Sequence, residues 1–271
     1  MRYIQSLLGT CPYHILFVSK PLKFITMKPI NKWAVLMILG TSMIAAACSE
    51  DVDTPNPSIN ENFDLTSTSA VYNDELEQVE MMIEVAGLAG KTTPTPAGQL
   101  DGAPVLGYVL PTTLNSNDVG FGNADGIVAM ALTSHPDFDD TPLWDENNDR
   151  DYTNDGLVWH SHWVVLVDDS RVGGGLSVKQ FNAGDPDVEL PPTNPGMPMY
   201  MDSPGYQVIA EGNTITVIIP SAFLNHKTDF NFDAVTARME VNTSNADLPL
   251  LGVYEIYEVL SQNLSLPYSV K

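Results

Sequence analysis

The chain has 271 residues, of which 44% are hydrophobic, and its formal net charge at pH 7 is −22. This charge excludes nucleic acid and anionic lipid surfaces as electrostatic partners, because the sequence-independent part of nucleic-acid affinity comes from Lys and Arg side chains that meet phosphate. The charge favours divalent cations as partners instead.

A leader pattern begins at Met27. Lys28 and Lys32 form a positive n-region, residues 33–46 form an apolar h-region, and "IAAAC" ends in Cys48 after small residues. This is the layout of a secretory signal peptide, and it resembles the lipobox of bacterial lipoproteins, in which the cysteine becomes the acylated first residue. The resemblance implies a signal peptide over residues 27–47, lipidation of Cys48 with palmitate-like chains, and anchoring in the cell outer membrane. Residues 1–26 precede this complete leader and are interpreted as an over-long start.

An uncleaved membrane anchor is the alternative, but the apolar run is shorter than the ~20 residues that span a bilayer. The acidic run "CSEDVD" resembles the surface-export tags of some Gram-negative lipoproteins, so we expect the chain to face the periplasm or the cell surface. Residues 48–70 are rich in Ser, Thr, Asn, Pro and acidic residues and have no apolar period, which predicts a flexible tether.

Removal of the leader changes both the charge and the cysteine count. The first 48 residues hold five of the twelve basic residues and none of the 34 acidic ones, which leaves the mature chain with seven basic residues and a formal charge of −27. Once Cys48 is lipidated, no cysteine remains for a disulfide, a zinc-thiolate site or a thiol nucleophile. We therefore expect stability to come from a hydrophobic core.

Alternating apolar residues dominate residues 71–271. In "VEMMIEVAG" the side chains of Val79, Met81, Ile83 and Val85 fall on one face, the period-two pattern of a half-buried strand. Similar runs follow in chain order: "VLGYVL", "GIVAMALTSH", "LVWHSHWVVLV", "LSVKQF", "YQVIA", "TITVIIP", "RMEV" and "GVYEIYEV". The "AEGNT" between two of them is a hairpin signal. About nine short strands without intervening helices predict one all-β domain, an antiparallel β-sandwich or jelly roll.

One pair of segments carries a further resemblance. The run "EGNTITVIIPSAFL", followed by "DFNFDAVTARMEV", resembles the strand, proline, short turn and strand signature of secreted carbohydrate-binding and DOMON-like β-sandwiches. The resemblance covers roughly a tenth of the chain and supports the fold. A glycan-binding accessory module is one functional hypothesis that it leaves open, with Trp144, Tyr152 and Tyr200 as aromatic side chains for stacking on a sugar ring.

The acidic segment "DENNDRDYTNDG" is a candidate calcium loop. It offers oxygen ligands at every second residue, which suits an ion that takes six to eight of them; the candidates are Asp145, Asn147, Asp149, Asp151 and, behind them, Asp155. The run resembles the first half of an EF-hand-type loop. Arg150 stands where the turn glycine belongs and Gly156 where the bidentate Glu belongs, so an irregular calcium loop or a solvated polar loop are the two interpretations.

The strand after this loop carries a His-x-His pair. In an extended chain His160 and His162 project from the same face, roughly 7 Å apart, and both imidazoles could reach one zinc or copper ion. His135 could supply a third ligand if its strand pairs with this one. "VWHSHW" also resembles, over six residues, the two-histidine strand of alpha-type carbonic anhydrases, whose third histidine comes from a later strand, and no later apolar strand here carries one. The alternative to a metal site is that the two histidines on this strand make only ordinary hydrogen bonds.

A methionine group follows in "NPGMPMYMDSPG", where Met197, Met199 and Met201 alternate. Thioether sulfur suits Cu(I), although methionines also fill irregular gaps in a core. The motifs GxSxG, HExxH, the P-loop and SxxK are all missing, so no familiar enzyme class is indicated. The sequence thus predicts a lipoprotein whose β-domain acts as a binding module for a cation, with calcium as the favoured ion. The alternatives are a zinc- or copper-dependent enzyme or metal carrier, and a module that binds a glycan or another surface protein.

Overall fold

The computed structural model describes residues 60–95, 100–136, 150, 155–182 and 184–271, all of which belong to one structural unit. Within these residues there are thirteen strands, three short 3-10 helices and no α-helix. The 3-10 helices are η1 (Ser116–Val119), η2 (Asp155–Leu157) and η3 (Ser221–Leu224). The strands are β1 (Leu65–Asn73), β2 (Gln78–Val85), β3 (Pro104–Pro111), β4 (Ile127–Ser134), β5 (His160–Asp168), β6 (Leu176–Val178), β7 (Met201–Asp202), β8 (Gln207–Glu211), β9 (Thr214–Pro220), β10 (Asn231–Phe232), β11 (Val235–Val241), β12 (Leu251–Val259) and β13 (Tyr268–Ser269).

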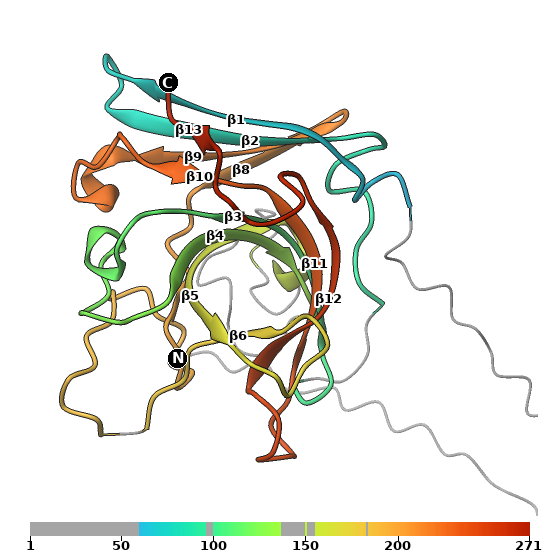
Figure 1. The fold of residues 1–271 in the computed structure, drawn as a ribbon, viewed down its shortest axis with the longest axis vertical. Helices are drawn as coiled ribbons and strands as arrows, with labels where there is room; N and C mark the ends of the chain where they lie inside the picture. Colours follow the sequence, from blue (N-terminus) through green and yellow to red (C-terminus); the bar gives the residue numbers. More distant parts are fainter. Residues whose placement is uncertain (1–59, 96–99, 137–149, 151–154, 183) are drawn as a thin grey trace, which may run out of the picture. The chain divides into compact units, whose positions relative to one another are not determined.

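All strand pairs are antiparallel, which confirms the predicted all-β class. The larger sheet has the order β4-β3-β11-β12-β6-β5, and β5 pairs again with β4, so six strands close into a barrel (Figure 1). The two-residue strand β7 adds to β5 outside this ring. The predicted sandwich or jelly roll is therefore not the form that the larger sheet takes. Closure pairs every wall strand on both sides and so removes free edges.

The smaller sheet, in the order β1-β2-β9-β8, covers the outer face of part of the barrel wall. Val79, Met81, Ile83 and Val85 of β2 are each fully buried, as their alternation predicts. They belong to one core cluster with the outward side chains of β3, β4 and β5, among them Tyr108 and Trp163. A second cluster fills part of the barrel interior.

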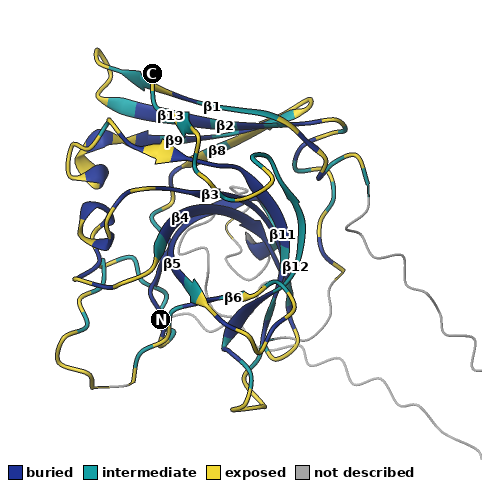
Figure 2. Ribbon diagram, viewed as in Figure 1, coloured by how far each residue is buried: buried dark blue, intermediate teal, exposed yellow. Residues whose placement is uncertain are grey.

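This layering explains why three strands lack clean alternation. Strands β3, β4 and β5 are buried along almost their whole length, because the smaller sheet covers one face and the barrel interior the other (Figure 2). A strand buried on both faces shows a near-continuous apolar run, as in "VLGYVL" and "IVAMAL".

The folded unit begins earlier in the chain than the sequence indicated. Strand β1 starts at Leu65, inside the segment predicted as tether, and pairs with β2 along its whole length. Phe63 is 1% exposed and its ring stacks on Tyr108 at a centroid distance of 5.2 Å. Most side chains of β1 are exposed or half-buried, and several of them are polar. The strand therefore shows no apolar period of two, and the sequence did not predict it.

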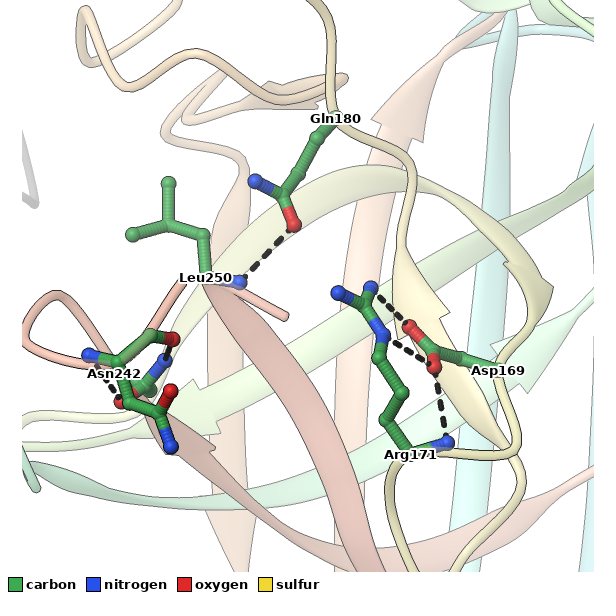
Figure 3. Close-up of polar contacts among 6 residues, drawn as sticks. Asp169, Arg171, Gln180, Asn242 and Leu250 are labelled. Carbon is green, nitrogen blue, oxygen red and sulfur yellow. Dashed lines mark hydrogen bonds and ion pairs between the residues drawn. The ribbon is translucent and has the colours of Figure 1, made fainter. Parts of the chain in front are cut away.

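Local contacts fix the turns of the larger sheet. After β5, the Arg171 guanidinium donates to both carboxylate oxygens of Asp169, with Nε–Oδ1 and Nη2–Oδ2 distances of 2.8 and 2.6 Å (Figure 3). The Leu250 N–H, just before β12, donates to Gln180 Oε1 at 3.0 Å (Figure 3). The predicted "AEGNT" hairpin joins β8 to β9, and its glycine, Gly212, has a φ of 61° that L side chains rarely adopt.

Candidate metal centre and barrel cavity

Three histidines meet on the inner face of the barrel, where β4 ends and β5 begins. Antiparallel pairing places Ala131 opposite His162 and Thr133 opposite His160. His135 follows two residues after Thr133, and its N–H donates to the Gly156 carbonyl at 2.9 Å, which holds the chain beside the start of β5. The predicted common face of His160 and His162 is confirmed, and the strand pairing on which a third ligand from His135 depended is present.

The three imidazoles form a close cluster. One nitrogen of each ring lies within 4.8 Å of the others, and His135 Nε2 lies 3.1 Å from His160 Nε2. The ring centroids of His160 and His162 are 4.7 Å apart. All three residues are buried, with exposed fractions of 4%, 1% and 3% for His135, His160 and His162. Among the residues that the structure describes, this is the one group of three or more His, Cys, Asp or Glu side chains close enough to share a metal ion.

Each imidazole has its Nδ1 atom against a backbone carbonyl. His135 Nδ1 lies 2.9 Å from the Pro136 oxygen and His160 Nδ1 lies 2.7 Å from the Val158 oxygen. His162 Nδ1 lies 3.3 Å from the Asp202 carbonyl and 3.0 Å from Ser203 Oγ. A carbonyl only accepts, so these contacts are hydrogen bonds when Nδ1 carries the hydrogen. In a neutral ring this leaves the lone pair on Nε2.

Burial keeps the three rings neutral. Loss of solvent lowers the pKa of His135 to about 4 and the pKa of His162 to about 3. For His160, burial together with the neighbouring His162 and His135 rings lowers the pKa well below its ordinary value. A neutral imidazole is the form that binds metal, whereas an imidazolium does not.

The cluster opens onto a cavity of about 330 Å³ inside the barrel. Its wall consists mainly of aliphatic and methionine side chains, and no charged side chain lines it among the described residues. His135 and His162 form part of the wall together with Thr133, so two of the three candidate ligands face the open space. A six-stranded barrel leaves little internal room. Small inward residues such as Ala131 and Ala237 line the open space here.

The three predicted methionines lie in the wall of the same cavity. Met199 and Met201 are 1% and 5% exposed and belong to the barrel core, and Met197 is packed against that core. All three line the cavity along with His135 and His162. The alternating methionines therefore share one environment, the barrel core. Their thioethers fill space there, which is the second of the two roles that the sequence suggested.

Most of the remaining candidate site residues lie outside the part of the chain that the structure describes. Cys48 and the calcium candidates Asp145, Asn147, Asp149 and Asp151 lie outside the described residues, as do Trp144 and Tyr152. Asp155 is described as the first residue of η2. Tyr200 is 6% exposed and packs edge-on against Phe121 and Phe181, so its proposed role as an exposed sugar-stacking ring is wrong.

Sequence reasoning missed two polar neighbours of the cluster. Ser203 contacts His162 from a position 41 residues further along the chain, through β7 pairing with β5. Thr133 is 4% exposed, and its Oγ1 has no hydrogen-bond partner among the described residues. The position of Thr133 two residues before His135, at strand period, was a usable signal for a shared face; nothing in the sequence marked Ser203.

No protein-family model matches the chain, and no curated protein and no solved structure shows significant similarity to it. The described part of the chain has no helix that is both long enough and apolar enough to cross a membrane.

Proposed function

We propose that this chain is a membrane-anchored lipoprotein whose barrel domain binds a transition-metal ion, zinc in the first place, through His135, His160 and His162. The anchoring part rests on the leader pattern that ends in Cys48. The metal part rests on one observation, the 3.1 Å distance between His135 Nε2 and His160 Nε2.

The carbonyl contacts place a hydrogen on Nδ1 of both His135 and His160. Both Nε2 atoms are then hydrogen-bond acceptors, and two acceptors at 3.1 Å repel each other unless a cation lies between them. A proton could take that place only by making one ring an imidazolium, which burial disfavours. A metal ion removes the repulsion without an imidazolium.

The donor set fits zinc. Three imidazoles, each with its second ring nitrogen held by a carbonyl, match the way metal-binding histidines are oriented in proteins. No carboxylate or thiolate joins the cluster among the described residues. Zinc with three protein ligands keeps a fourth position open and acts as a Lewis acid. Since His135 and His162 line the cavity, that side is where a further ligand would approach.

Copper is the second candidate, and the observation that favours it is the methionine-rich cavity wall. Imidazole and thioether ligands together suit Cu(I). The calcium loop over residues 145–155 also stays a prediction, as does binding of a glycan or surface protein.

The test is the metal content of the chain, purified without a chelator and without a histidine tag, by mass spectrometry. We expect close to one equivalent of zinc per chain, and a chelator should lower the melting temperature because an ion that binds only the native state stabilises it. Stoichiometric copper would favour the second candidate. Failure to retain zinc or copper after both have been offered would contradict the proposal.

A further inference from the structure

The polar side chains in the cavity wall differ in whether they have a hydrogen-bond partner within the protein. Thr112 Oγ1 donates to the Val128 carbonyl, Thr113 Oγ1 accepts from the Asn231 N–H, and Asn115 donates to Asp118. These three cavity-lining side chains therefore have partners in the protein. Thr133 Oγ1 is buried in the same wall and has none among the described residues.

An unpaired buried hydroxyl is costly, because its hydrogen bond to water is lost without replacement. Thr133 lies opposite His160 in the β4–β5 pairing and two residues before His135, so the hydroxyl lies at the histidine end of the cavity. A ligand with an oxygen acceptor at that end would satisfy the hydroxyl and reach the metal position at the same time.

The rest of the wall specifies the body of the ligand. It is mainly aliphatic and carries no charged side chain among the described residues, and the cavity measures about 330 Å³, roughly twice the ~150 Å³ of an apolar cavity that holds one benzene. This volume has room for an apolar body of roughly eight to ten carbon atoms. Pockets of this size that combine an apolar wall with a few polar groups at one end are typical small-molecule sites.

The charge of the metal ion indicates which polar group the ligand carries. Three neutral imidazoles bring no negative charge to a zinc ion, and no charged side chain lines the wall among the described residues. A buried charge needs an opposite charge or hydrogen bonds close by. A carboxylate provides both a negative charge for the ion and an acceptor for Thr133.

From these observations we infer that the barrel cavity binds a monocarboxylate with a medium-length apolar body, with its carboxylate between Thr133 and the three-histidine centre. This inference rests on the proposed metal site, which supplies the cation. It assigns the cavity a ligand class and assigns Thr133 the role of a binding residue.

The experiment is a titration of octanoate into the full chain labelled with ¹³C at the methionine methyl groups, in zinc-loaded and metal-free forms. Met199, Met201 and Met239 line the cavity, whereas Met81 and Met130 pack in the core between barrel and smaller sheet and serve as references. We expect saturable shifts of the cavity methyl signals, constant reference signals, and affinity at least tenfold higher in the zinc-loaded form.

Two variants test the assignment. Thr133→Val keeps the shape but removes the hydroxyl, and should weaken octanoate binding about five- to tenfold at unchanged zinc content; Thr133→Ser should restore it. Ala237→Leu fills the cavity and should abolish octanoate binding without loss of zinc. Ala210→Leu, at an exposed position of β8, is the matched control that should bind like the wild type.

The outcomes separate the two proposals. Zinc binding without any octanoate-induced shift of the cavity methyls would overturn the ligand inference and leave the metal proposal standing. Octanoate binding that depends on Thr133, in a chain that takes up no zinc, would support the cavity site and overturn the metal proposal. Equal octanoate affinity in the wild type and Thr133→Val would overturn the assigned position of the carboxylate.

Discussion

His135 Nε2 lies 3.1 Å from His160 Nε2, and both residues are buried. Two nitrogens that bind the same tetrahedral zinc, each at ~2.0–2.1 Å from it, are about 3.4 Å apart. The pair therefore needs only a small adjustment to hold one ion. His162, whose nitrogen lies within 4.8 Å of the other two, has to move closer.

Loss of one ligand should remove the metal. We expect His160→Gln to lower zinc affinity by more than the ~10–100-fold that loss of an outer-shell partner costs, because a first ligand contributes more. The measurement is a competition titration with a chromophoric chelator. His226→Gln, in an exposed loop away from the cluster, is the control and should bind zinc like the wild type. Equal affinity in the two variants would exclude His160 as a ligand.

The Ser203 hydroxyl should affect the zinc affinity of the site without being a metal ligand. Its Oγ lies 3.0 Å from His162 Nδ1, so it helps to orient the ring. We expect Ser203→Ala to retain one zinc per chain with affinity reduced about tenfold, since the Asp202 carbonyl still holds Nδ1. Ser116→Ala removes a buried hydroxyl that bonds to Gly122 and Ala124, and is expected to cost about 1 kcal/mol of stability with zinc affinity unchanged. A Ser203→Ala affinity equal to the wild type would show that the hydroxyl does not orient the ring.

Packing of the smaller sheet on the barrel can be tested with two adjacent methionines. Met81 is fully buried between the layers, whereas Met82 lies on the opposite face of β2 and is only half-buried. We expect Met81→Ala to lower the free energy of unfolding by about 2–5 kcal/mol, the usual cost of a cavity in a core. Met82→Ala should cost roughly 1 kcal/mol or less. Urea unfolding of both variants gives the comparison, and similar losses would argue against the observed layering.

The Asp169–Arg171 pair predicts a pH dependence of stability. Hydrogen bonds from Arg171 lower the pKa of Asp169 well below its ordinary value (Figure 3). The unfolded chain therefore takes up a proton at this group at higher pH than the folded chain, so the contribution is complete above pH ~4 and declines as the pH falls below it. We expect Asp169→Asn to destabilise at pH 7 and to converge toward the wild type near pH 3, as measured by urea unfolding at both pH values. A constant difference would show that the ion pair is not the cause.

Strand positions were largely readable from the sequence, because side chains alternate along an extended chain and a buried face then shows as a period of two. The nine predicted segments each overlap a strand of the structure. The strands that were not predicted are short, as in β7, β10 and β13, or mostly polar, as in β1, and give no apolar period.

The sequence by itself determined that His160 and His162 share a face, since their spacing admits only that in a strand. It also determined that Val79, Met81, Ile83 and Val85 lie in the core. Only the tertiary structure decided that β5 pairs with β4 and closes a barrel, because pairing between strands depends on contacts that no local pattern encodes. That closure brings His135 to the pair, encloses the cavity, and leaves Thr133 facing it.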